Sequence, residues 1–124
     1  GRTKEGLETG LKRLKEIRQE FETQLFIPGA KEGLNVELEK ALRLNDFITM
    51  GQLIAYDALN RNESCGGHFR EEYQTEEGEA KRDDENYFYV ACWEYQGSDD
   101  VAPVLYKEPL VYEAIKVQTR NYKS

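Results

Sequence analysis

Residues 34–62, LNVELEKALRLNDFITMGQLIAYDALNRN, decide the fold of this 124-residue chain. Apolar residues recur there at the three- and four-residue spacing of an α-helix, and Asn35 is a suitable N-cap, so we predict one helix over residues 35–62. A helix that is apolar over a wide arc is normally covered from several sides. Two neighbouring stripes make up this arc, the first being Leu34, Leu38, Ala41, Leu44, Ile48, Gly51, Ala55 and Leu59, and the second Phe47, Met50, Ile54 and Ala58.

An amphipathic helix is also predicted upstream, from Thr3 to about Leu25. Its stripe is Leu7, Leu11, Leu14, Ile17, Phe21 and Leu25, while pairs such as Glu8 with Lys12 occupy its polar faces. Gly6 and Gly10 weaken the first turns, so this end needs something packed on it. Pro28, Gly29 and Gly33 then break the pattern and predict an antiparallel helical hairpin over residues 3–62.

The second helix carries more apolar surface than the first can cover. We therefore expect Phe47, Met50 and Ile54 to line a surface left partly open in this chain, where a partner or a second copy docks. The missing neighbour is either the C-terminal segment or something outside this chain.

Residues 63–85 are expected to form a loop that becomes strongly acidic, and residues 86–124 an aromatic strand region with a tail. Alternation over residues 87–95 predicts a strand, and residues 97–100 a turn. Residues 104–106 and 110–117 return as strands, with Pro103 and Pro109 limiting them to edges or breaks. The predicted fold is thus mainly α, with an irregular C-terminal region containing short strands, in a single domain over residues 1–124.

Composition excludes several functions. The net charge is −7, and residues 71–85 (EEYQTEEGEAKRDDE) alone hold eight acidic and two basic residues, so the chain lacks the basic surface of a nucleic-acid binder. The acidic run also lacks the spacing of a calcium-binding EF-hand loop. No segment has the 18 or so apolar residues of a membrane span, so we expect no direct membrane insertion and a soluble fragment. Cys65 and Cys92 have no CxxC spacing, and free thiols in a reducing compartment are expected.

The densest cluster of chemistry-bearing residues is Glu63-Ser64-Cys65-Gly66-Gly67-His68-Phe69-Arg70-Glu71. Cys65 and His68 could supply two ligands to zinc, or a nucleophile and its base, but neither reading finds its remaining partners nearby. The alternative is that the glycines end the helix and turn the chain, while His68 and Arg70 hydrogen-bond to a neighbouring surface. None of the ten glycines forms GxGxxG or a P-loop, so a self-contained cofactor enzyme is not expected.

The same cluster resembles a known family. It is similar to the C-terminal motif of succinate dehydrogenase and fumarate reductase flavoproteins. The matching residues are Ala58, Leu59, Arg61, Glu63, Ser64, Gly66, His68 and Arg70, followed by Arg82, Asp83, Asp84 and Glu85. Cys65 stands where that family usually has Arg, and Gly67 where it usually has Ala. L-Aspartate oxidase has a similar segment, although the Tyr-rich tail looks more like the dehydrogenase branch.

The resemblance implies a piece of a longer flavoprotein, consistent with a start, GRTKEGLETG, that lacks Met. The parent would bind FAD in an upstream domain, interconvert succinate and fumarate, and pass electrons to an iron-sulfur subunit on the cytoplasmic side of the inner membrane. The helical hairpin would then be the remnant of a three-helix, spectrin-repeat-like bundle whose first helix precedes Arg2. No catalytic, cofactor or metal residue is assigned to this chain. The residues expected to contact the flavin domain or the iron-sulfur subunit are Glu63, Ser64, His68, Arg70, Arg82, Asp83, Asp84, Phe47, Met50 and Ile54.

Two other hypotheses follow from the residues alone. An autonomous helical interaction module would use the same apolar face of the second helix to bind a partner. A small metal-dependent enzyme would instead be centred on Cys65 and His68.

Overall fold

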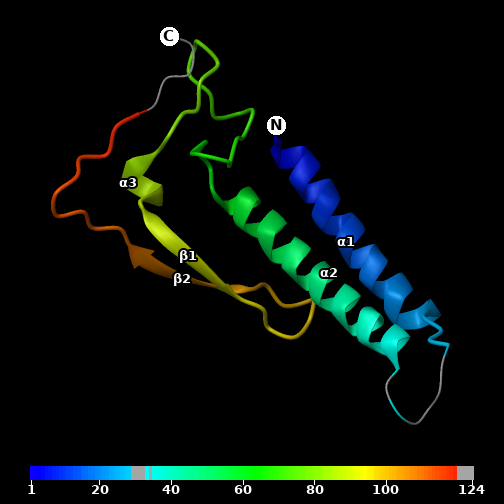
Figure 1. Cartoon of the computed structure of the whole chain (residues 1–124). Coiled ribbons are helices and arrows are strands. Elements are labelled where there is room, and N and C mark those ends of the chain that lie inside the picture. The colour runs from blue at the N-terminus through cyan, green and yellow to red at the C-terminus, as the bar shows by residue number, and fades with distance from the viewer. Residues whose placement is uncertain (29–32, 34, 120–124) are drawn as a thin grey trace.

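The computed structural model describes residues 1–28, 33 and 35–119. Two long helices, α1 (Lys4–Gln24) and α2 (Val36–Asn60), lie side by side and antiparallel (Figure 1). The strands β1 (Tyr89–Glu94) and β2 (Val104–Pro109) form a hairpin next to α2, and a short helix, α3 (Asp84–Tyr87), leads into β1. The predicted mainly helical fold with a small C-terminal sheet is confirmed, while the predictions for Gly29 and Leu34 lie outside the described residues.

Side-chain caps fix where both long helices begin. The hydroxyl of Thr3 accepts a hydrogen bond from the backbone N–H of Gly6 at 3.0 Å, and the side chain of Asn35 accepts one from Leu38 at 3.1 Å. Each cap satisfies a donor that has no partner inside its helix. The predicted N-cap at Asn35 is confirmed, and the predicted ends of the helices are correct to within two residues.

The N-terminal end of α1, which its glycines weaken, is tied to the loop that follows α2. Arg2 donates its backbone N–H to the carbonyl of Phe69 at 3.0 Å and accepts one from Glu71 at 2.8 Å. The chain start and the loop that follows α2 (residues 61–72, hereafter the motif loop) therefore lie at the same end of the helical hairpin (Figure 1).

The ion pairs on α1 differ from the predicted ones. Glu8 lies 4.0 Å from Lys4 rather than pairing with Lys12. Within the described residues, Lys12 has no ion pair.

The strand region differs from its prediction at both ends. Asp83 accepts the backbone N–H of Asn86 at 3.2 Å and so caps a helical turn, which removes Tyr87 from the strand despite its place in the alternating pattern. The expected strand over residues 110–117 is wrong, because β2 runs to Pro109 and the following residues pair with no strand of the described chain. The boundary set by the two prolines is confirmed, since Pro103 precedes β2 and Pro109 ends it.

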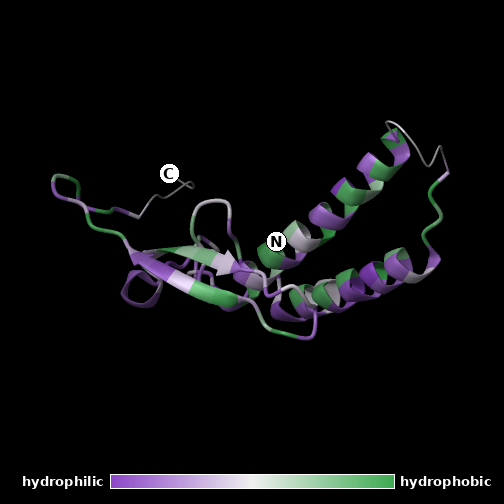
Figure 2. Ribbon diagram, turned by 90° about the horizontal axis from the view of Figure 1, so that it is seen from below, coloured by the Kyte–Doolittle hydropathy of each residue, from purple (hydrophilic) through white to green (hydrophobic). Residues whose placement is uncertain are grey.

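Little of the described chain is fully buried. Among the described hydrophobic side chains only Ile48 and Ala58 are, whereas the buried polar residues are Arg18, Glu63, Ser64 and Arg70. Hydrophobic positions recur along both helices and the strands (Figure 2), yet many of their side chains face solvent. Polar contacts therefore hold the helices, the loop after α2 and the β-hairpin together to a large extent.

Candidate docking site

Ser64 and Arg70 close the loop that follows α2. The hydroxyl of Ser64 accepts from the backbone N–H of Arg70 at 2.8 Å and donates to its carbonyl at 3.1 Å. The guanidinium of Arg70 donates to the carbonyls of Ala58 and Leu59 at 3.1 and 3.2 Å. These carbonyls belong to the last turn of α2 and have no partner within the helix, so Arg70 satisfies the end of α2 from outside it.

Cys65 and His68 flank a tight turn. Each donates its backbone N–H to the other's carbonyl, at 2.8 and 3.0 Å, and Gly66 adopts a positive φ of 58° between them. The His68 ring bonds to the carbonyl of Arg61 through Nε2 at 2.9 Å and to the guanidinium of Arg2 through Nδ1 at 3.0 Å. Because a guanidinium can only donate, Nδ1 accepts and Nε2–H donates.

This arrangement does not favour the metal and nucleophile hypotheses. Both ring nitrogens of His68 are engaged, and Cys65 is an exposed free cysteine. In the part of the chain that the structure describes, no three His, Cys, Asp or Glu side chains come together as a metal site.

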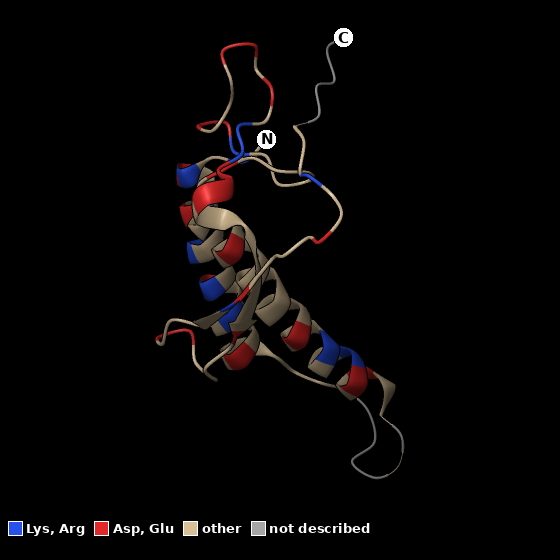
Figure 3. Cartoon of the chain, turned by 90° about the vertical axis from the view of Figure 1, so that its left-hand side faces the viewer, with Lys and Arg blue, Asp and Glu red and all other residues tan. Residues whose placement is uncertain are grey.

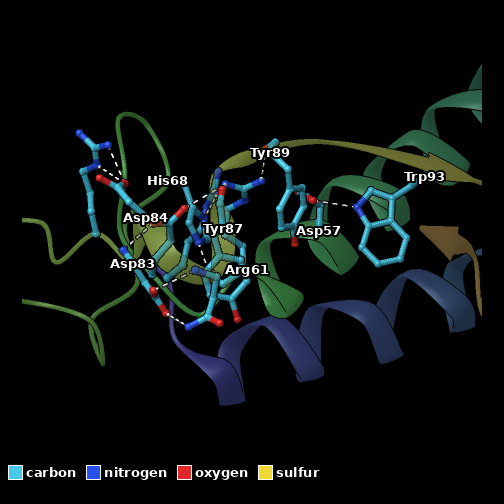
Figure 4. A network of polar contacts seen from close by, with 12 residues as sticks. Asp57, Arg61, His68, Asp83, Asp84, Tyr87, Tyr89 and Trp93 are labelled. Atoms are coloured by element: carbon cyan, nitrogen blue, oxygen red, sulfur yellow. Dashed lines mark hydrogen bonds and ion pairs between the residues drawn. The ribbon is translucent and has the colours of Figure 1, made fainter. Parts of the chain in front are cut away.

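Arg61 joins the motif loop to the aromatic strand, as Figure 4 shows. Its guanidinium pairs with Glu63 at 2.9 Å and donates to the carbonyls of Tyr87 and Tyr89, both at 3.2 Å. It also lies 5.8 and 5.1 Å from the centroids of these two rings, a cation–π arrangement. The second carboxylate oxygen of Glu63 accepts the backbone N–H of Asp83 at 2.9 Å, so one buried acid connects the two halves of the motif.

Glu72 ties the motif loop to the start of α1. The backbone N–H of Lys4 donates to its carboxylate and, as the largest cause, holds the pKa of Glu72 at about 2. A further backbone hydrogen bond and the nearby Arg70 guanidinium, at 3.1 Å, lower this pKa in the same direction.

A buried arginine between the helices was missed by the sequence analysis. Arg18 of α1 is 6% exposed and donates to Asn45, Thr49 and Gln52 of α2 at 2.6 to 2.8 Å. It also pairs with Asp99 in the β1–β2 loop at 3.0 Å. A signal was present, because Leu11, Leu14, Arg18, Phe21 and Leu25 follow steps of three and four, which places Arg18 on the apolar stripe itself.

Trp93 anchors the β-hairpin to α2. Its indole N–H donates to the carboxylate of Asp57 at 2.7 Å (Figure 4). Its ring also meets that of Tyr56 edge to face, at 5.1 Å between centroids. The hairpin therefore covers one side of the later half of α2. The C-terminal segment, which was one of the two partners expected for α2, therefore packs on this helix.

Another side of α2 stays open. Phe47, Met50 and Ile54, hereafter the apolar ridge, are 69%, 57% and 55% exposed, which confirms the expectation of a partly open surface. Exposed apolar side chains spaced three and four residues apart are the pattern with which a helix packs on another protein surface.

The polar residues that were expected to make contacts differ in how exposed they are. Glu63, Ser64 and Arg70 are buried and bond within the chain. Asp84 is exposed and pairs with the half-buried Arg82 at 2.6 Å. Acidic and basic positions are interspersed along the helices (Figure 3), so the candidate docking site is distinguished by the apolar ridge rather than by charge.

The helical hairpin, its motif loop and its β-hairpin define a mainly helical domain with a small antiparallel sheet. A chain from a mutant FrdA of E. coli quinol fumarate reductase has this fold, with a TM-score of 0.77 and 22% sequence identity. The match covers 95% of the present chain but 19% of that one, so the present chain spans about a fifth of its structural relative.

The sequence match is to a particular family. The family model described as fumarate reductase flavoprotein C-term matches residues 1–122, and the chain therefore belongs to this family. The resemblance drawn from the motif is confirmed.

The described residues do not form the strand, glycine turn and helix that bind a dinucleotide. The sequence has no GxGxxG turn, and neither described long helix follows a strand, which is the arrangement that cradles a dinucleotide. No helix within the described ranges is long and apolar enough to cross a membrane.

Proposed function

We propose that this chain is a non-catalytic docking domain of a fumarate reductase or succinate dehydrogenase flavoprotein. The observation that carries the proposal is the apolar ridge on a domain that matches this family from residue 1 to residue 122. The parent binds FAD in its other part, interconverts succinate and fumarate, and passes electrons to an iron-sulfur subunit. Partner subunits hold it at the cytoplasmic side of the inner membrane.

In this proposal the motif loop builds the docking surface and the ridge makes the contact. Arg70, His68 and Arg61 hold the end of α2 and its neighbouring segments in place through internal bonds. The apolar ridge then packs on the flavin-binding domain. The exposed Asp84, paired with Arg82, offers a polar contact to the parent. Burying three half-exposed apolar side chains stabilises such a contact by about 3 kcal/mol.

The experiment uses the full-length flavoprotein that contains this chain. Met50→Asp places a charge on the ridge and is expected to reduce assembly with the iron-sulfur subunit and retention of FAD. Leu42→Asp is the matched control, because Leu42 is also exposed on α2 (60%) but lies outside the ridge. Equal loss for both variants, or for neither, would contradict a docking role for the ridge.

Activity measurements separate the proposed parent from its relatives. The full-length protein should oxidise succinate or reduce fumarate, whereas oxidation of L-aspartate would identify an L-aspartate oxidase. Titrating the 124-residue chain alone with FAD and succinate should give neither tight flavin binding nor turnover. Either result in the chain alone would overturn the non-catalytic assignment.

A further inference from the structure

A cavity of about 360 Å³ lies where α1, α2 and the β1–β2 loop meet. This volume is in the range of small-molecule sites, which are concave and mostly apolar with a few placed polar groups. The lining is of that kind and includes Leu11, Lys12, Leu53, Tyr56, Val101 and Pro103.

Two anchors keep this space open. Trp93 holds the β-hairpin to Asp57 near the end of α2, and Asp99 holds the following loop to Arg18 in the middle of the helical hairpin. Leu53 of α2 lies between the two anchors and lines the cavity. The loop is thus fixed at both sides of a gap that no described side chain fills.

The charges around the cavity are matched except for one. Asp99 pairs with Arg18 at 3.0 Å, and Lys15 pairs with Asp100 at 2.7 Å. Lys12 lines the same cavity, and within the described chain its ammonium has no ion pair or hydrogen bond.

The acids one turn away from Lys12 on α1 are themselves engaged. Glu8 pairs with Lys4 at 4.0 Å and Glu16 with Arg13 at 3.1 Å. The surroundings of the cavity therefore leave one positive charge beside an apolar interior.

We propose that this cavity binds a small apolar monocarboxylate, with its carboxylate on Lys12 and its hydrocarbon body against Leu11, Leu53 and Tyr56. One unmatched ammonium selects a single negative charge, and the apolar lining selects an aryl or alkyl body over a second charged group. The cavity is separate from the proposed docking surface, since none of its lining residues belongs to the apolar ridge. The inference therefore does not rest on the docking proposal.

The test titrates the whole chain with 4-phenylbutyrate and, separately, with the uncharged 4-phenylbutanol, followed by backbone amide NMR shifts. The acid should shift Leu53, Ser98 and Val101 saturably, with a Kd of about 0.1–1 mM for a ligand of this size. The alcohol should bind about fivefold or more weakly, because it lacks the charge-assisted contact with Lys12.

Variants identify the lysine. Lys12→Gln should weaken binding of the acid about fivefold and leave the alcohol unchanged, while Lys40→Gln, an exposed lysine of α2 outside the cavity, should change neither. Lys12 is exposed, so its replacement leaves the fold intact, as far-UV circular dichroism will check.

Three outcomes would overturn the proposal. These are the absence of saturable shifts at 10-fold above the expected Kd, shifts centred on the apolar ridge, and equal affinity for acid and alcohol. The last would show an apolar pocket suited to a partner's side chain instead of a carboxylate site.

Discussion

Arg70 shows how a residue that looks functional can act through structure. A conspicuous arginine after two glycines invites a binding role, yet its side chain is 2% exposed and its guanidinium bonds to two carbonyls in the last turn of α2. Its ring contact with Tyr73, at 5.4 Å, and its pairing with Glu72 complete the burial of the charge. The spacing of the motif is therefore explained by the geometry of one helix end.

We predict that Arg70→Met lowers the free energy of unfolding by about 2–4 kcal/mol, because it leaves the Ala58 and Leu59 carbonyls without donors. Urea unfolding followed by circular dichroism measures the change. Arg43→Met is the control, since Arg43 is an exposed partner of Glu39, and should cost less than about 0.5 kcal/mol. Similar losses in the two variants would contradict the capping role.

At the scale of elements, sequence patterns predicted those features that interactions between near neighbours in the chain determine. The helix periodicity and the Asn35 cap gave the bounds of α2 because both act within a few residues. The alternation at Tyr87 failed, since the Asp83 cap favours a helical turn there and a strand needs a partner. The same holds after Pro109, where β-branched residues alone could not form a third strand.

The sequence motif singled out Glu63, His68 and Arg70, and apolar periodicity singled out the ridge. Their role as contacts in the parent stays a prediction. Their partners depend on segments brought together by tertiary packing, as when Glu63 meets the backbone of Asp83. Arg18 was hidden for the same reason, because its acid, Asp99, lies in a distant loop.

The attachment of the β-hairpin to α2 gives a prediction at this scale. A double-mutant cycle of Trp93→Phe with Asp57→Ala should show a coupling of about 1–2 kcal/mol in urea unfolding, since a half-buried N–H donates to a carboxylate. Tyr106→Phe with Glu94→Gln, an exposed pair at 2.9 Å, is the matched cycle and should couple by less than about 0.5 kcal/mol. Additive effects at Trp93 and Asp57 would mean that the hairpin is held elsewhere.

At the scale of the whole molecule, the small apolar core and the open ridge belong together. Ile48 and Ala58 are the only fully buried hydrophobic side chains of the described residues, so polar contacts such as those of Arg18 must position the helices. Apolar burial is the main favourable term in folding. A domain that leaves so much of its apolar surface outside gains stability when that surface is covered.

The ridge therefore predicts weak self-association of the isolated chain. Covering the remaining exposed part of Phe47, Met50 and Ile54 contributes about 1 kcal/mol per side chain, or about 6 kcal/mol for a symmetric dimer. Association costs about 4–15 kcal/mol, which leaves about 2 kcal/mol at most, so the dimer should have a Kd of tens of millimolar or weaker. Concentration-dependent amide NMR shifts, followed up to millimolar protein, measure it.

Phe47→Asp should abolish this dimer, because two facing charges would have to be buried without partners, whereas Leu42→Asp, outside the ridge, should leave the Kd unchanged. A dimer of nanomolar affinity, or one that survives Phe47→Asp, would place the self-association surface elsewhere. A dimer weakened only by Phe47→Asp would show that the ridge is adhesive but too small to act alone, which is the property expected of a face that packs on a larger protein.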